Sequence, residues 1–252
     1  MASLTLTALA GIPFVRQGDD LVGLILQGLR RSRIRCEDGD VLVVAQKIVS
    51  RAEGRLVDLR AVTPSAEAQA LARKTEKDPR LVELILQESR AVLRAAPGVL
   101  IVEHRLGFIC ANAGIDHSNV CGDEDCVLLL PEDPDRSAAA LRRSLETATG
   151  KRLGVIINDS HGRAWRLGTM GLAIGLSGVP GVVDLRGRAD LVGRPLQATL
   201  VAAADELAAA ASLLMGQAAE GRPVVHARGF PYPLAEAALP DLLRPPERDL
   251  FR

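Results

Sequence analysis

The chain has 252 residues, of which 48% are hydrophobic and 25% are charged, the composition of a globular protein with a sizeable core. Its 31 basic and 31 acidic residues cancel, so no field of one sign favours nucleic acid or an anionic membrane. Aromatic residues make up only 2%, which argues against a base-stacking platform for nucleic acid and leaves the core to Leu, Val, Ile and Ala.

The sequence shows no signal for secretion or for a membrane. No basic stretch followed by an apolar run opens it, and no apolar run of about 18 residues is free of charge. Four cysteines in a chain of this length are too few for a disulfide scaffold, and their spacing matches no usual zinc pair. We therefore expect a cytoplasmic protein with reduced thiols.

Short apolar runs alternate with amphipathic helical stretches in the first half of the chain. Leu21, Ile25 and Leu29 recur at helical spacing after Asp20, a good helix-start residue. The elements predicted next are a buried strand over residues 40–47, helices over 64–77 and 79–90 that each carry proline near the first turn, and strands over 99–103, 108–111 and 126–130.

The second half of the chain opens with a well-marked helix. Asp133 suits the N-cap, Pro134 the first helical position and Gly150 the residue just past the end. The elements predicted after it are a buried strand over residues 153–157, a glycine-rich segment over 168–181, an alanine-rich helix over 196–215 with an apolar stripe from Leu200 to Leu214, a strand over 224–227 and a helical, frayed C-terminus.

Strands and helices mix along the chain without a strict βαβ repeat. This order favours an α+β fold with mixed sheets and flanking helices over a doubly wound parallel sheet. There is no internal repeat and no low-complexity linker, so we expect a single unit over residues 1–252. Two subdomains would also be compatible, with a boundary that composition does not place.

The familiar nucleotide-binding signatures are absent, since neither G-x-x-x-x-G-K-[ST] nor G-x-G-x-x-G occurs. Two polar segments that follow predicted strands are candidates instead, residues 112–119 and 158–163. In the first, Asp116 could face a divalent cation and Asn119 a phosphate or a ribose. On residue types alone a simple turn is favoured here, because Asn, Gly, Asp and Ser are all turn formers.

The second polar segment follows the most convincing strand of the chain. Asp159 and Ser160 would offer a carboxylate and a hydroxyl at the end of that strand, hard oxygen ligands suited to Mg²⁺ or Mn²⁺. Arg163 or Arg166 could meet phosphate oxygens. The alternative is again a polar turn. We expect Asp159 to lie just beyond the strand in a polar loop, with its carboxylate outside the core. Two segments that each place Asp beside Ser or Asn favour a shared metal site.

A third candidate is the end of the strand predicted over residues 40–47. Lys47 and Arg51 could grip phosphates there, and a solvated strand end is the equal alternative. Neither H-E-x-x-H nor G-x-S-x-G occurs, so covalent hydrolytic catalysis is poorly supported.

Several further motifs, highly specific in combination, extend over nearly the whole chain. They are Gly11-Ile12-Pro13, Gly18-Asp19-Asp20-Leu21, Gln46-Lys47-Ile48-Val49-Ser50, Glu53-Gly54-Arg55, Asp78-Pro79-Arg80, Asn112-Ala113-Gly114-Ile115-Asp116, Ser118-Asn119-Val120, Asp159, Gly162-Arg163 and Trp165-Arg166. With them the chain resembles the coenzyme F-420:L-glutamate ligase (gamma-glutamyl ligase) family in its stand-alone form. Some relatives carry an extra C-terminal flavin domain, which we do not expect here.

The resemblance implies a reaction, a fold and an assembly. GTP would phosphorylate the lactyl carboxylate of a phosphorylated deazaflavin precursor, and the amine of L-glutamate would attack the acyl phosphate to form an amide, with release of GDP and phosphate. Mg²⁺ or Mn²⁺, with K⁺ as a further cation, would support phosphoryl transfer. The family also implies a gamma-glutamyl-ligase-like fold in an intertwined homodimer, with GTP, L-glutamate and the precursor as partners.

The resemblance also assigns site residues position by position. It implies that Asp116 and Asp159 act in catalysis and, with Ser160, bind the metal. The nucleotide contacts that it implies are Gly11, Ile12, Pro13, Phe14, Gln46, Lys47, Arg51, Asn119, Met215, Gly216 and Gln217, the last three in a looser loop over residues 215–222. Three positions depart from the family pattern: Ser160 stands where Thr is common, Arg51 where Lys is usual and Gln46 where a small hydroxyl residue is frequent. The last two bear on the preference for GTP more than on the reaction type.

Two other functions remain open from the sequence. One is a ligase of the same mechanism that acts on another phosphorylated or carboxylated cofactor. The other is a non-catalytic protein that binds the deazaflavin coenzyme. That second reading predicts loss of the metal-binding carboxylates, yet Asp116 and Asp159 are both present.

Overall fold

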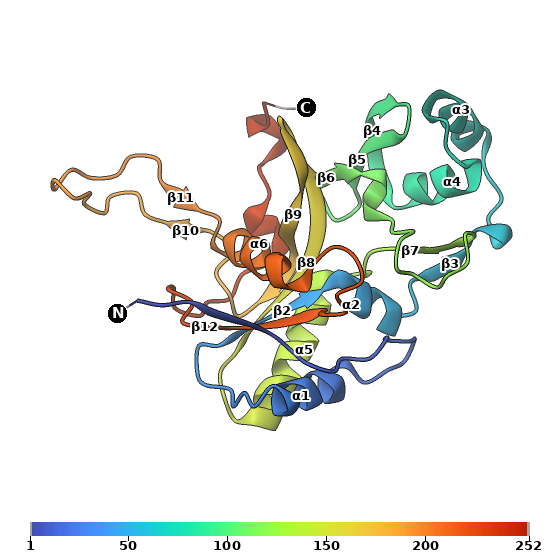
Figure 1. Ribbon diagram of the computed structural model, residues 1–252. Coiled ribbons are helices and arrows are strands. Elements are labelled where there is room, and N and C mark those ends of the chain that lie inside the picture. The colour runs from blue at the N-terminus through green and yellow to red at the C-terminus, as the bar shows by residue number, and fades with distance from the viewer. Residues whose placement is uncertain (1, 251–252) are drawn as a thin grey trace.

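The computed structural model describes residues 2–250, and a five-stranded sheet organises them (Figure 1). The strands lie in the order β1 (Thr5–Ala8), β12 (Val224–Arg228), β2 (Val41–Ala45), β8 (Gly154–Arg163) and β9 (Arg166–Ser177). Only β2 and β8 run parallel, and the other neighbours are antiparallel. The prediction of an α+β fold with mixed sheets and flanking helices is confirmed, and the dimer stays a prediction.

The centre of this sheet is buried on both faces. Along β2, Leu42 and Val44 face one hydrophobic cluster while Val41 and Val43 face another. Helices α1 (Leu21–Arg31) and α5 (Pro134–Thr149) cover the first face, and α6 (Ala203–Met215) covers the second. A strand buried on both faces reads as a continuous apolar run rather than an alternating one, which is why the sequence marks β2 so clearly.

Local signals set the helix ends where they were expected. In α5 the Asp133 side chain accepts a hydrogen bond from the backbone N–H of Arg136, and Gly150 ends the helix at φ 69°. Two glycines of β9 let the covering helices approach closely. A Cβ on Gly171 would lie 2.6 Å from the Ala208 carbonyl oxygen of α6, and one on Gly175 would lie 2.5 Å from the backbone of Pro134. The glycine-rich segment is therefore largely a strand that packs directly against α5 and α6.

A smaller part of the molecule lies at the upper right of Figure 1. It contains a three-stranded sheet of β4 (Ser89–Ala96), β5 (Val99–His104) and β6 (Ile109–Ala111), helices α3 (Ala66–Thr75) and α4 (Pro79–Gln87), and the strand pair β3 (Leu56–Asp58) with β7 (Cys126–Leu128). Glu88, just after α4, links two segments of this part, because its carboxylate lies 2.8 Å from the guanidinium groups of Arg55, which precedes β3, and Arg105, which follows β5. Burial raises the pKa of Glu88, but hydrogen bonds from His104, Arg105 and Arg55 outweigh it and lower the pKa to about 2.

Several predicted boundaries were wrong. The strand over residues 40–47 ends at Ala45, and helix α2 (Gln46–Ala52) begins at the next residue. The strand over residues 153–157 continues to Arg163, because β9 pairs with it along its whole length. The alanine-rich helix begins only at Ala203. Leu200 belongs instead to β11 (Leu200–Val201), which pairs with β10 (Val183–Asp184) at the base of a projecting arm (Figure 1).

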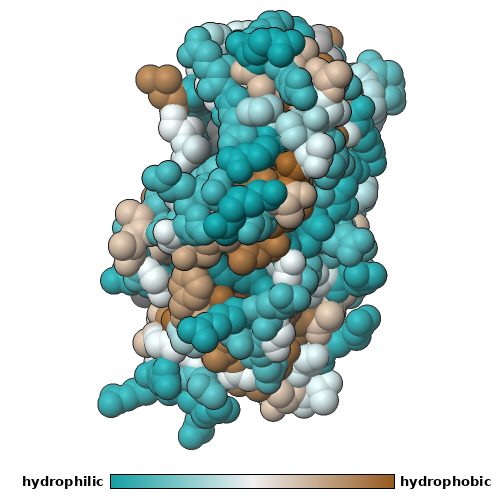
Figure 2. Space-filling model, turned by 90° about the vertical axis from the view of Figure 1, so that its right-hand side faces the viewer, coloured by the Kyte–Doolittle hydropathy of each residue, from teal (hydrophilic) through white to brown (hydrophobic). Residues whose placement is uncertain are grey.

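The remaining elements are short. Four 3₁₀ turns occur among residues 2–250: η1 (Leu59–Ala61), η2 (Asn112–Gly114), η3 (Leu239–Leu242) and η4 (Pro246–Arg248). The helical C-terminus that was predicted consists of the last two turns. Figure 2 shows mostly hydrophilic side chains on the face at the right of Figure 1, with hydrophobic ones near its middle. No helix in the described part of the chain is long and apolar enough to cross a membrane.

Candidate functional site

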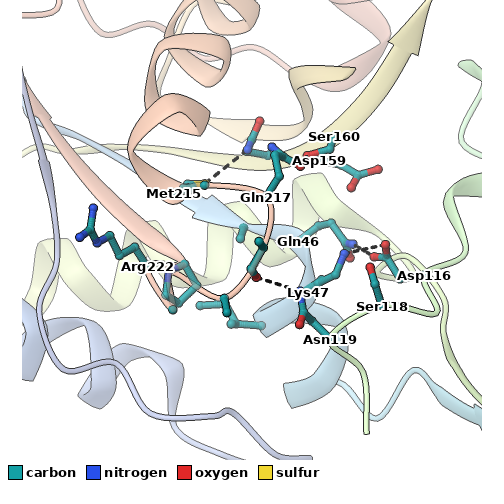
Figure 3. Close-up of a pocket in the computed structure, with 18 of the residues that line it drawn as sticks. Gln46, Lys47, Asp116, Ser118, Asn119, Asp159, Ser160, Met215, Gln217 and Arg222 are labelled. Carbon is teal, nitrogen blue, oxygen red and sulfur yellow. Dashed lines mark hydrogen bonds and ion pairs between the residues drawn. The ribbon is translucent and has the colours of Figure 1, made fainter. Parts of the chain in front are cut away.

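A pocket opens where the parallel strands β2 and β8 end together, at the paired residues Ala45 and Asn158. Ligands often bind at the carboxyl ends of parallel strands, because the chain leaves the sheet there and several loops converge. The cavity has a volume of about 500 Å³. Its lining residues are Ile12, Pro13, Phe14, Ala45, Gln46, Lys47, Ile48, Arg51, Asp116, Ser118, Asn119, Asn158, Asp159, Ser160, Thr169, Met215, Gly216, Gln217, Ala218, Ala219, Gly221, Arg222 and Pro223 (Figure 3).

The cavity gathers residues from six separate stretches of the chain, and nearly every predicted site residue is among them. Gly11 is one exception, because its carbonyl accepts a hydrogen bond from Arg31 at 2.6 Å, outside the lining. Arg163 and Arg166, the candidate phosphate contacts, also lie outside it, where they pair with each other at the far end of β8 and β9. The assignment missed Ser118 and Asn158, although both lie in the polar segments that the sequence singles out. It also missed Thr169, for which the glycine-rich segment gave no signal.

Asp116 projects into the pocket from a fixed backbone position. Its N–H and carbonyl both pair with Leu128, the last residue of β7, at 2.9 Å. Lys47 Nζ lies 2.6 Å from one carboxylate oxygen, and Gln46 Nε2 donates to the other at 2.5 Å (Figure 3). Burial raises the pKa of Asp116, and the charge of Asp159 raises it further, against the opposing effect of Lys47.

Asp159 lies within β8, and the expectation that it sits in a polar loop outside the core was wrong. It pairs with Leu172 of β9 in extended backbone, and only 8% of its surface is exposed. Its carboxylate lies 2.8 Å from Nε2 of His161, two residues along the strand on the same face. Burial by itself raises the pKa of Asp159, but His161, the Ser160 backbone N–H and the charge of Lys47 together outweigh it, and the net pKa is lowered.

Oxygen ligands for a metal are available in this pocket. Figure 3 shows Asp116 and Asp159 on the same side of the cavity, with Ser160 beside Asp159. No cluster of three or more His, Cys, Asp or Glu side chains that could hold a metal occurs among the residues described. Two carboxylates and a hydroxyl nevertheless fit Mg²⁺, which usually takes one or two carboxylates and completes its shell with phosphate oxygens and water. The residues present thus fit the metal that the sequence predicts.

Lys47 and Arg51 lie one turn apart on α2, so both face the pocket, and their assignment to a strand end was wrong. The Arg51 guanidinium lies 3.9 Å from the centre of the Phe14 ring. It also donates hydrogen bonds to the carbonyls of Asn119 and Val120. A cation and an aromatic ring in such contact attract each other, and together they form the outer wall of the cavity.

The loop after α6 closes the opposite side. Asn119 donates from its side chain to the Ala218 carbonyl at 3.0 Å, and Ser160 donates to Gln217 Oε1 at 2.9 Å. Gly216 has φ 76°, and a Cβ there would meet the Glu220 carboxyl group, which itself accepts from the Ala218 N–H. These contacts hold the loop over the pocket without filling it.

Two of the four cysteines lie near the wall formed by Arg51 and Phe14, and they are not reduced as expected. Cys121 and Cys126 form a disulfide, with Cα atoms 6.4 Å apart, whereas Cys36 and Cys110 are free. The prediction of reduced thiols throughout was therefore wrong for this pair. A spacing of four intervening residues does not reveal whether a loop folds back on itself, so the pairing could not be read from the sequence.

Comparison with known proteins places the chain first in a class, the amide-bond-forming ligases that act with L-glutamate. The family model for F-420-0:gamma-glutamyl ligase matches residues 11–229. The coenzyme F-420:L-glutamate ligase of Methanothermobacter thermautotrophicus is 47% identical over 251 residues, 99% of either chain. Those of Methanopyrus kandleri and Archaeoglobus fulgidus are 48% and 46% identical, and the matches cover 94% and 96% of this chain and 93% and 94% of theirs. The chain belongs to the F-420-0:gamma-glutamyl ligase family, as its motifs predicted.

Proposed function

We propose that this protein joins L-glutamate to the precursor of coenzyme F-420, and that GTP and a divalent metal drive the reaction. The observation that supports this proposal is that one cavity brings Asp116, Asp159 and Ser160 together with Lys47 and Arg51. Paired carboxylates that face cationic side chains suit phosphoryl transfer, where charge must be offset on several phosphate oxygens at once. Family membership supports the choice of glutamate and of the precursor.

In this proposal the reaction has two steps. A carboxylate oxygen of the precursor attacks the terminal phosphorus of GTP, the bond to the bridging oxygen breaks, and GDP leaves. The glutamate nitrogen then attacks the acyl carbon, loses a proton and forms the amide as phosphate leaves. A metal bound by Asp116, Asp159 and Ser160 would offset the charge of the phosphate oxygens.

The chain's own side chains orient the reacting groups. His161 lies 2.8 Å from the Asp159 carboxylate and helps to lower its pKa. Lys47 balances Asp116 at 2.6 Å and lines the cavity, where its ammonium group can contact a phosphate. Arg51 braces the wall formed by Asn119 and Val120 against Phe14. The two outer loops, joined by Asn119 and Ala218, limit the access of water to the acyl phosphate.

We further propose that the protein is a homodimer. The arm that β10 and β11 begin projects from the body (Figure 1). It carries Leu191 fully exposed and Val192 at 75% exposure. Apolar side chains at the end of such an arm favour contact with another protein surface. Light scattering at micromolar concentration should give twice the chain mass, and a monomer mass at all concentrations would contradict the dimer.

The reaction is tested by incubating the protein with the precursor, L-glutamate, Mn²⁺ and either GTP or ATP, followed by mass analysis of the product. We expect a glutamyl adduct that forms much faster with GTP than with ATP and disappears after exhaustive chelation of metal. Absence of any adduct would refute the ligase. Equal rates with the two nucleotides would refute only the preference for GTP, and turnover without metal would refute only the metal requirement.

A further inference from the structure

The strand segment that carries Asp159 has a strand neighbour on one side only. β2 pairs with β8 as far as Asn158, and from Asp159 onward β8 pairs with β9 alone. β6, in the smaller part of the molecule, packs against β8 (Figure 1). Backbone pairing fixes the Cα atom of Asp159, but the direction of its carboxylate depends on the side chains packed around it. The neighbours of this carboxylate outside the cavity therefore bear on how it meets a cation.

His161 is such a neighbour. Its Nε2 lies 2.8 Å from the Asp159 carboxylate, and the two residues share a face of β8 because they are two positions apart. Only 7% of the surface of His161 is exposed, and the residue does not line the cavity. His161 thus contacts the carboxylate without occupying the space in which a cation would bind.

Phe108 holds the His161 ring in turn. Their ring centroids are 5.1 Å apart with the planes tilted by 49°, and Phe108 also stacks in parallel on His104 at 5.0 Å. Rings at these separations attract each other. Phe108 is the one Phe, Tyr or Trp side chain that is buried within residues 2–250. In a core made almost wholly of aliphatic side chains, the buried aromatic ring therefore lies between two histidines, one of which contacts Asp159.

The far end of this row of rings is fixed by the backbone. His104 is fully buried, and its Nδ1 accepts a hydrogen bond from the Leu106 N–H at 3.0 Å. The His104 N–H donates to the Phe108 carbonyl at 2.9 Å, and the Gly107 N–H donates to the His104 carbonyl at 2.8 Å. Gly107 has φ 100°, which glycine adopts without strain. This tight turn leaves the Phe108 ring little freedom, and Phe108 in turn restricts the His161 ring.

We propose that Phe108 is a positioning residue for metal binding, which acts through the His161 ring to keep the Asp159 carboxylate directed at the cavity. The inference rests on the ligase function and the metal ligands proposed above. A ligand that is already oriented loses less conformational freedom when the cation binds. Groups that orient a metal ligand without touching the metal typically account for roughly 10–100-fold in metal affinity. The turn between β5 and β6 thereby supports the catalytic cavity from the smaller part of the molecule.

The test measures Mn²⁺ affinity by electron paramagnetic resonance, in the presence of a non-hydrolysable GTP analogue. It compares the full-length wild type with Phe108→Leu, His161→Gln and the double variant. Phe230→Leu is the matched control, because Phe230 also contacts another ring, that of Tyr232 at 5.6 Å, and lies outside the cavity. We expect Phe108→Leu to lose about tenfold in affinity, and Phe230→Leu to bind like wild type. Since Phe108 acts through His161, the double variant should bind no more weakly than His161→Gln alone.

Ligation provides a second readout, which a general loss of packing would not reproduce. Excess Mn²⁺ should restore kcat of Phe108→Leu close to the wild-type value, because the carboxylate is still present and only its orientation is lost. Phe108→Met, which keeps more of the volume, gives the same comparison if Phe108→Leu does not fold. Wild-type Mn²⁺ affinity in the folded Phe108 variant would overturn the proposal, and so would additive losses in the double variant. A wild-type protein that binds no Mn²⁺ or forms no glutamyl adduct would instead refute the proposed function.

Discussion

The two ends of the β2–β8 pair are built from the same residue types and do different things. Before β2 begins, Asp40 is 2% exposed and lies 2.7 Å from His226 Nε2. Where β8 leaves the sheet, Asp159 is 8% exposed and lies 2.8 Å from His161 Nε2. Burial raises the pKa of both carboxyl groups, and their partners bring the net pKa below its usual value in each case.

The difference lies in what else each carboxylate binds. Asp40 also accepts two hydrogen bonds from the Arg228 guanidinium, at 3.0 and 2.8 Å, and one from the Glu37 N–H at 2.9 Å. Four protein donors thus surround the Asp40 carboxylate, three at one oxygen and one at the other. Asp159 has His161 and the Ser160 backbone as partners and lines an open cavity. A saturated buried carboxylate stabilises the fold, and an unsaturated one beside a cavity is available to a ligand.

The largest expected effect is on catalysis at the end of the β2–β8 pair where Asp159 lines the cavity, called here the open end. Asp159→Asn keeps the size of the side chain and removes the charge, so a hard cation loses a ligand. We expect ligation to fall about 10²–10⁴-fold, as when a transition-state contact is removed, with a small change in melting temperature. Glutamate incorporation and melting are measured on the same preparation. A well-folded variant with wild-type turnover would show that Asp159 only shapes the strand.

At the other end of the pair, the closed end around Asp40, a substitution should lower stability and leave catalysis unchanged. Asp40→Asn leaves His226 and Arg228 around a neutral side chain in a buried site. Breaking a buried charge pair by altering one partner destabilises by roughly 3–5 kcal/mol. We expect a loss of that order in the free energy of unfolding by urea, with kcat unchanged below the unfolding temperature. A stable Asp40→Asn protein that has lost activity would reverse the comparison between the two ends.

A second closed cluster, around Glu88, predicts how stability depends on pH. Its folded pKa of about 2 lies below the ordinary value of 4.5, so its contribution is complete above pH 4.5 and is lost as pH falls towards 2. The contribution amounts to about 3 kcal/mol, at about 1.4 kcal/mol per pKa unit. Wild type should exceed Glu88→Gln in unfolding free energy at neutral pH, and the two curves should converge near pH 2. A constant gap would rule out this titration.

The smallest effect concerns the cation already paired with Asp116. Lys47 would compete with a metal for that carboxylate when no nucleotide is present. Lys47→Met should therefore bind Mn²⁺ about tenfold more tightly without GTP, the effect of one nearby charge at intermediate dielectric. Lys151→Met is the matched control, because Lys151 pairs with Asp38 away from the pocket. Equal Mn²⁺ affinity in wild type and Lys47→Met would show that the pair does not oppose metal binding.

Local signals explain what could be predicted from the sequence. The caps Asp133 and Gly150 define α5, and the apolar run of β2 marks a strand buried on both faces. The extension of β8 through Asp159 could not be predicted, because polar residues remain extended there only through pairing with β9. Most cavity residues in the polar segments and family motifs were identified, although Ser118 and Asn158 were missed, and Thr169, placed by strand register alone, was not identified either.

The most direct test of the contrast between the two carboxylates is Mn²⁺ binding in the presence of a non-hydrolysable GTP analogue, followed by electron paramagnetic resonance. Wild-type protein should bind the ion, and Asp116→Asn and Asp159→Asn should each lose at least about tenfold in affinity, since an amide is a weaker ligand for a hard cation. Folded Asp40→Asn should bind like wild type. Wild-type affinity in Asp159→Asn, or a comparable loss in Asp40→Asn, would contradict the assignment of the open carboxylates to the metal.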